Sequence, residues 1–406
     1  MMNFEEFKDQ VAENILGHFP EEFQEAEVRI ERRVKNNDTV REGITIHKQD
    51  EAISPMIYLE GYFEEYKNGA NLDELMDQMT TQYLHHQLES RDMNVSGIMD
   101  YDSIKDKITC RLVSFENNQE RLANAPHKMV SDLAVSYHIV INVNEEGIGS
   151  VMIDNSMMER YGVTVDDLHE QAIANMPTMN PVVFKPLSET MLEVMVPDFM
   201  AEHPELSEDQ AREMLEEMIP HDGPEPYVLT CENKINGASE LIVPAVREMV
   251  AEKIGGDYFI LPSSIHETLI LPKNNAMEVD ELVAMVQEVN STMVQQEEIL
   301  SDHVYEYDAK KQEIVRADKV QEQSHEQSQE KQQEQEKSHD QGKEQDAPEQ
   351  EVEQKRRQVV AARQETASLE KLREKKQEEY RKAVQKGEEL FIEEVVAAQK
   401  AMAALS

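Results

Sequence analysis

The chain has no tryptophan, two cysteines among its 406 residues, and fewer than half as many basic as acidic side chains. Two cysteines cannot build a disulfide framework. Because Cys110 and Cys231 lie in apolar, strand-like runs, we expect both to be buried and reduced. No stretch approaches the roughly 18 unbroken apolar residues that a membrane-spanning helix needs, and the acidic N-terminus lacks the basic and apolar regions of a secretory signal. These absences predict a cytoplasmic protein without a membrane segment.

The scarcity of basic residues leaves a net charge of −43. The first 318 residues hold 63 acidic and 24 basic side chains, so the excess belongs to the part whose composition is typical of a folded protein. A surface of this sign repels phosphate backbones, which argues against direct binding of nucleic acid, and it favours a basic protein partner. A second interpretation is a mimic of nucleic-acid charge, which requires the carboxylates to form one stripe at phosphate-like spacing.

Short apolar runs separated by turn signals predict an α+β fold, with mostly antiparallel sheets flanked by helices. Residues 1–92 are expected to form an α-β-β-β-α module, and residues 93–317 the main α+β domain. Residues 318–350 are rich in Gln and Glu and almost free of apolar side chains, so we expect a disordered linker. Residues 351–406 consist largely of helix-forming residues and predict a C-terminal helix, either single or in a coiled coil through which the chain self-associates.

Several residues in the main domain predict where helices begin and end. Thr164 and Ser207 have the chemistry of N-caps, because their hydroxyls can accept unpaired backbone N–H groups. Gly255 is a predicted C-cap, since glycine adopts the left-handed conformation without strain. Pro177 is expected to end the helix that starts after Thr164.

One stretch, GGDYFILPSSIHETLILP at residues 255–272, concentrates the residue types that carry chemistry. In an extended chain Ser264 and His266 project to the same face, with Glu267 next to them, which makes the three residues candidates for a hydrolase site. A catalytic serine normally lies on a tight, glycine-flanked turn, and this segment has no such elbow. The other interpretation is therefore a β-hairpin whose turn contains Pro262 and the two serines.

Motifs for cofactors and metals are missing. The chain contains no phosphate-binding P-loop, no dinucleotide-binding glycine pattern and no H-E-x-x-H zinc motif, so we expect neither a cofactor nor a metal site. Methionine, in contrast, is abundant, with 23 residues that concentrate in the middle of the chain. Because methionine fills irregular cores and also lines adaptable binding grooves, both interpretations stay open.

Five segments carry a resemblance to known proteins: MNPVVFKPL, YVLTCENKINGAS, EKIGGDYFILPSSIHETLILP, EVNSTMV and EEILSDHVYEYD. Together they resemble a family of uncharacterised proteins, a domain of unknown function, from gut Clostridia and their mobile elements, over roughly residues 5–315. The later half is also similar to a second uncharacterised family of Bacillus-type bacteria, which has a different sequence in place of PSSIHE. Neither resemblance implies an activity.

These observations favour a non-enzymatic, acidic protein-binding or accessory factor, such as an accessory factor of a mobile element. A hydrolase that uses Ser264, His266 and Glu267 is the alternative from another class, so the sequence leaves it uncertain whether the protein is an enzyme and leans against it. The surroundings of residues 262–267 discriminate between the two, because a hydrolase needs these side chains within hydrogen-bond reach in a pocket.

Overall fold

The computed structural model describes residues 2–48, 54, 56–90, 97–144, 147–219, 225–273 and 278–320. Within these ranges the chain forms three antiparallel sheets with helices packed on them, which confirms the predicted α+β class. The predicted linker, apart from its first three residues, and the predicted C-terminal helix lie outside the described residues. None of the helices in the described ranges is long and apolar enough to cross a membrane.

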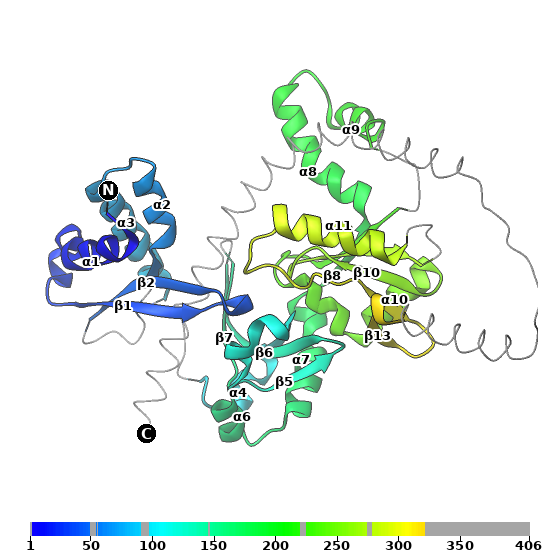
Figure 1. The fold of residues 1–406 in the computed structure, drawn as a ribbon, viewed down its shortest axis with the longest axis horizontal. Helices are drawn as coiled ribbons and strands as arrows, with labels where there is room; N and C mark the ends of the chain where they lie inside the picture. Colours follow the sequence, from blue (N-terminus) through cyan, green and yellow to red (C-terminus); the bar gives the residue numbers. More distant parts are fainter. Residues whose placement is uncertain are drawn as a thin grey trace, which may run out of the picture.

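The first sheet has the strand order β1-β2-β3 and packs against helices on one face (Figure 1). On β2, Ile44 and Ile46 point into this core while Thr45 points to the other face, as the two-residue period of a strand requires. The helix α2 was not expected from the sequence. The elements of this part are α1 (Phe4–Asn14), η1 (Ile15–His18), η2 (Glu21–Phe23), β1 (Glu27–Val34), η3 (Asn36–Asp38), β2 (Val40–His47), β3 (Met56–Tyr58), α2 (Glu60–Lys67) and α3 (Leu72–Ser90).

The second sheet is built around the long strand β6, which pairs with β4 on one side and with β5 and β7 on the other. Helix α7 packs on β4, where Cys110 and Met176 meet in the core. Its elements are α4 (Tyr101–Ile104), η4 (Lys105–Lys107), β4 (Ile108–Ser114), η5 (Glu116–Asn118), α5 (Gln119–Leu122), β5 (His127–Val130), β6 (Leu133–Asn144), β7 (Gly147–Met152), α6 (Asn155–Tyr161) and α7 (Val165–Met179).

One predicted helix end is wrong. Thr164 does cap α7, with a reciprocal capping box to Asp167, but the helix does not end at Pro177. It continues to Met179 with the proline inside it. The ring removes one backbone donor, but only Thr178 and Met179 follow it in the helix, and the N–H of Asn180 still donates to the carbonyl of Met176.

The third sheet has six strands in the order β13-β12-β10-β11-β9-β8. Both faces are covered, which explains why β10 is an unbroken apolar run: Phe259 and Leu261 pack with Leu282 of α11, whereas Tyr258 and Ile260 join the core shared with the second sheet. The strands are β8 (Val182–Pro186), β9 (Tyr227–Cys231), β10 (Tyr258–Pro262), β11 (Thr268–Pro272), β12 (Tyr305–Asp308) and β13 (Glu313–Arg316), and the helices η6 (Gly237–Ile242), α10 (Pro244–Ile254) and α11 (Val279–Thr292).

Two further helices, α8 (Leu187–Glu202) and α9 (Glu208–Glu216), form a hairpin that extends away from the third sheet (Figure 1). They enclose a small apolar core of their own. The predicted caps Ser207, at the start of α9, and Gly255, which ends α10 with φ 91°, are confirmed.

Among the described residues, the apolar core of the first sheet is separate from the core that the second and third sheets share. The two parts meet where the tip of the β1–β2 hairpin, η3, touches a loop at residues 296–299 and also bonds to η5 and α5. We propose that they fold as separate units divided near residue 92.

Candidate functional site

The segment that contains the predicted serine, histidine and glutamate connects β10 to β11. The two strands pair antiparallel along their length, which leaves residues 263–267, here named the corner, as the turn. Oγ of Ser264 accepts the backbone N–H of His266 at 3.0 Å, and the backbone N–H of Ser264 donates to the carbonyl of Glu267 at 3.1 Å. Such local bonds from serine are a regular way of building a turn. The predicted hairpin is thus confirmed, except that Pro262, which was expected in the turn, is the last residue of β10.

Neighbouring segments hold the corner from two sides. The backbone N–H of Ile265 donates to the carbonyl of Glu298 at 2.8 Å, and the carbonyl of Ile265 accepts the N–H of Ala238 at 3.2 Å. The hydroxyl of Thr230 donates to the carbonyl of His266 at 2.8 Å. The backbone of the corner is therefore fixed by β9, by η6 and by the loop that precedes β12.

Close packing at η6 requires glycine. A Cβ at Gly237 would lie 2.3 Å from Oγ1 of Thr230 and 2.5 Å from the carbonyl oxygen of His266. Both distances are far below a van der Waals contact, so only the absence of a side chain lets η6 approach the corner.

The imidazole of His266 is buried and engaged. Its Nδ1 accepts the backbone N–H of Asn236 at 3.1 Å, and its Nε2 faces Oε1 of Glu298 at 3.8 Å. Burial, assisted by the charge of Arg111, lowers the pKa of His266 to about 4, so the ring is neutral at pH 7. Because Nδ1 accepts an N–H, the proton of the neutral ring sits on Nε2.

The structure brings the three predicted residues into one turn but joins them through the backbone. The bond between Ser264 and His266 involves the backbone N–H and not the imidazole. Burial raises the pKa of Glu267, against the opposing charge of Lys234 and a bond from Ser263. In this tautomer the ring nitrogen that could take a proton from a hydroxyl already accepts the N–H of Asn236.

Buried acids and thiols lie beside the corner. Glu240 of η6 is 2 % exposed, and burial raises its pKa to about 8. Cys110 and Cys231 are both buried and free, as predicted. Burial, with a contribution from the charge of Glu240, raises their pKa values to about 12 and about 11. Thiols with such values stay protonated and are poor nucleophiles.

The loop at residues 296–299 connects the corner to the first sheet. Nδ2 of Asn36 donates to the carbonyl of Glu297, and Nδ2 of Asn37 donates to the carbonyls of Gln296 and Ile299, each at 2.7 Å. Arg41 forms an ion pair with Glu297, whose side chain is 3 % exposed. The corner thus belongs to the joint between the two parts of the molecule.

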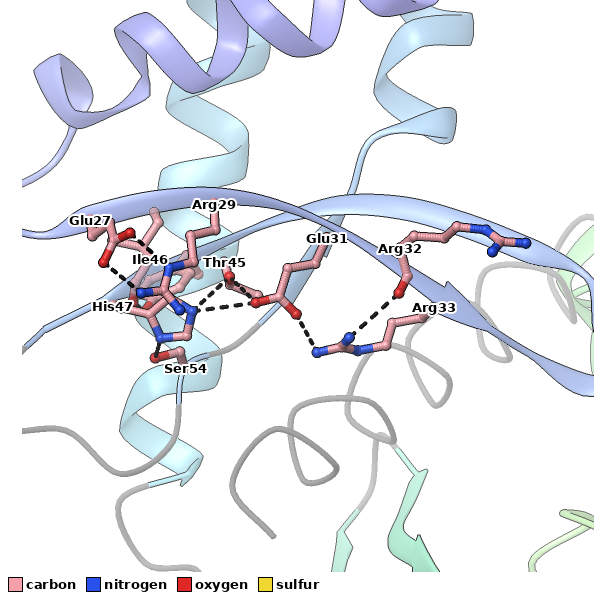
Figure 2. Close-up of polar contacts among 10 residues, drawn as sticks. Glu27, Arg29, Glu31, Arg32, Arg33, Thr45, Ile46, His47 and Ser54 are labelled. Carbon is pink, nitrogen blue, oxygen red and sulfur yellow. Dashed lines mark hydrogen bonds and ion pairs between the residues drawn. The ribbon is translucent and has the colours of Figure 1, made fainter. Parts of the chain in front are cut away.

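A second polar cluster, which sequence reasoning missed, lies on the first sheet (Figure 2). Nδ1 of His47 lies 3.0 Å from Oγ of Ser54, and its Nε2 lies 3.0 Å from Oγ1 of Thr45 and 3.4 Å from Oε1 of Glu31. A hydroxyl and a carboxylate on opposite ring nitrogens are the elements of a hydrolytic triad. Ser54 is 1 % exposed, however, so its hydroxyl is shielded from solvent.

The carboxylate in this cluster is held in its charged form. Burial raises the pKa of Glu31, but the charge of Arg33 and the bonds from Thr45 and His47 outweigh it, and the net pKa is lowered. The cluster draws on two strands and a later residue, so spacing along the chain does not reveal it. Thr45 and His47, two residues apart on one strand face, are the signal that sequence reasoning could have used.

A hollow of about 280 Å³ lies beside β6, lined mainly by aliphatic side chains around Ile98, Ile104 and Ile139, with Lys107 as its one charged group. Its size is just below the range of about 300–1,000 Å³ that is usual for small-molecule sites. In the described ranges, no three His, Cys, Asp or Glu side chains lie close enough together to hold a metal ion.

The family model of a family of unknown function (DUF5688) matches residues 4–309. No curated protein matches the chain, and neither does any solved structure.

Proposed function

The chain belongs to this family of unknown function, and we propose that it is a non-enzymatic accessory factor that binds a basic partner protein. The observation that carries the proposal is the charge of the folded part: 63 acidic against 24 basic side chains in residues 1–318. A surface with this much negative charge attracts basic surfaces and raises their association rates, and it repels acidic partners.

The geometry of the corner supports a non-enzymatic role. Ser264 uses its hydroxyl to order its own turn, and His266 uses Nδ1 to hold the backbone of Asn236. Groups that serve the backbone in this way are not free to bind a substrate or to move a proton. In this proposal, the corner supports the 296–299 loop, which contacts the first sheet.

The test is a titration of the full chain with a designed amphipathic peptide of lysine and leucine. The control is a peptide of the same length in which glutamine replaces lysine. We expect saturable binding of the lysine peptide that weakens steeply as salt rises, and no binding of the glutamine peptide. Equal binding of both peptides, or no binding of the lysine peptide at low salt, overturns the proposal.

A hydrolase remains the second candidate, because Ser54, His47 and Glu31 have the distances of a triad, in addition to the predicted Ser264, His266 and Glu267. A fluorophosphonate probe, which reacts with activated serines, separates the two functions. The accessory-factor proposal expects no labelling of the full chain. Labelling that Ser54→Ala or Ser264→Ala abolishes would establish the enzyme instead.

A further inference from the structure

The α8–α9 hairpin presents an apolar surface rich in methionine. Its small core holds Leu192, Ala211 and Leu215, with Met191 and Phe199 packed around them. Met214 and Met218 lie on the outside, 48 % and 67 % exposed. An exposed methionine does not contribute the stabilisation that burying its side chain would give. Met214 lies in α9, and Met218 lies in the turn that directly follows the helix.

The same hairpin is strongly acidic. Residues 187–219 contain ten Asp or Glu side chains and one basic residue, Arg212. Arg212 pairs with Glu216 at 3.2 Å, and outside the hairpin Lys185 pairs with Glu193 at 2.5 Å. Flexible methionines framed by carboxylates fit a helix that is apolar on one side and basic on the other.

The chain itself supplies such a segment. Residues 355–386 contain eleven Lys or Arg and five Glu, a net charge of +6 in a protein whose total is −43. Within this basic segment Leu369, Leu372, Tyr380 and Val384 recur near helical spacing. The 34 residues between the described part and the basic segment can span up to roughly 110 Å, which is enough to reach any face of the body.

We propose that the α8–α9 hairpin is the docking site for a basic amphipathic segment, and that residues 355–386 of the same chain occupy it. The inference rests on the proposed function, because it names the surface that binds the basic partner and gives that surface an internal competitor. A tethered competitor acts at an effective concentration near millimolar. It therefore prevents weakly basic partners from binding the hairpin, whereas strongly basic partners displace it.

The test uses the full chain with isotope-labelled methionine methyl groups and a nitroxide label on Ser368→Cys. The two native cysteines are buried, so the label goes to the new one. We expect the nitroxide to broaden the methyl signals of Met214 and Met218. The matched controls are Met129 on β5 and Met285 on α11, 47 % and 43 % exposed, whose signals should keep their width.

Reversing the charge of the basic segment in the same labelled chain, with Lys371→Glu, Lys375→Glu and Lys376→Glu, should remove the broadening. The reversed chain should also bind the lysine–leucine peptide about tenfold more tightly, as expected when a tethered competitor is lost. A mixture of spin-labelled chains and isotope-labelled chains detects docking between two copies. Broadening in that mixture, broadening of all four methionines, or broadening of none overturns the proposal.

These outcomes separate the inference from the proposed function. If the basic segment does not reach the hairpin but the lysine peptide still binds, the internal competitor is wrong and the accessory factor stands. If the lysine–leucine peptide binds neither the unaltered chain nor the charge-reversed chain, the proposed function itself fails.

Discussion

Asn236 donates its backbone N–H to Nδ1 of His266 over 3.1 Å, and this bond joins the start of η6 to the corner. Asn236 is the residue before η6 and adopts the left-handed conformation, with φ 56°. An imidazole used in this way must stay neutral, because protonation of Nδ1 would place two donors against each other. The relationship makes the histidine a structural acceptor and predicts how the protein responds to acid.

Acid should destabilise the protein through His266. Its pKa is about 4 in the folded state against about 6.5 when unfolded, so only the unfolded state binds a proton as the pH falls through this window. Stability is therefore fully present above pH 6.5 and is lost towards pH 4, by up to about 3 kcal/mol. His138, fully buried, has its pKa lowered by burial and adds a loss of the same sign.

Urea unfolding at a series of pH values measures this loss. His266→Gln keeps an acceptor but cannot be protonated, so we expect a shallower decline from pH 6.5 to 4 than in the unaltered chain. His203→Gln, at a half-exposed position, is the control for the substitution itself. An identical slope in the His266→Gln chain would show that folding does not lower the pKa of this ring.

Glu240 should have the opposite pH dependence. Burial raises its pKa to about 8, so the folded state keeps the proton that the unfolded state loses near pH 4.5. The contribution of Glu240 to the free energy of unfolding is complete below pH 4.5 and is lost as the pH rises towards 8. Glu240→Gln should therefore stabilise the chain at pH 9 by about 4 kcal/mol and have little effect at pH 4. The exposed change Glu252→Gln serves as the control, and equal effects of the two would refute the assignment.

Gly237→Ala should be severely destabilising, because the new Cβ would clash with Oγ1 of Thr230 and with the backbone of the corner. We expect a loss of about 3 kcal/mol or more in the free energy of unfolding. Gly17→Ala meets nothing within 4 Å and should change stability by less than about 0.5 kcal/mol. A Gly237→Ala chain as stable as the Gly17→Ala chain would mean that η6 does not rest on the corner.

The tip of the first hairpin can be dissected at Asn37, which has φ 57° and donates to two carbonyls of the 296–299 loop. Asn37→Gly keeps the left-handed conformation and loses these bonds together with the one that Asn37 Oδ1 accepts from Nδ2 of Asn118, at an expected cost of about 1–2 kcal/mol. Asn37→Ala adds the strain of the left-handed conformation, roughly 1 kcal/mol more. Thermal or urea unfolding of the two variants separates the contribution of the side-chain bonds from that of the backbone strain. If both variants were as stable as the unaltered chain, Asn37 would not stabilise the joint.

Local chemistry explains what could be predicted from the sequence. The hairpin at the corner and the caps Thr164, Ser207 and Gly255 each depend on residues within a few positions of one another, and all are found. Pro177 misled the prediction because a proline near a helix end removes one backbone bond and leaves the bonds of the preceding turns in place.

The missed elements depend on the rest of the fold. Helix α8 is apolar on most sides and contains Pro197, so its sequence shows neither helical periodicity nor a clear end. Strands β8 and β12 have five and four residues and pair with the distant strands β9 and β10, while the short strand β13 pairs with β12. The cluster of Ser54, His47 and Glu31 is likewise assembled by folding, which brings β1 and β2 together with a residue that follows them.

The most direct test compares peptide binding in the full chain after charge reversal at Lys371, Lys375 and Lys376. Met214→Gln with Met218→Gln leaves the net charge unchanged and removes the exposed apolar surface of the hairpin. Met129→Gln with Met285→Gln makes the same chemical change elsewhere. The account predicts that the hairpin variant binds the lysine–leucine peptide about tenfold more weakly while the other variant binds it unchanged. Equal affinities in the two variants would contradict a protein that works by binding a basic partner on this acidic, methionine-rich surface.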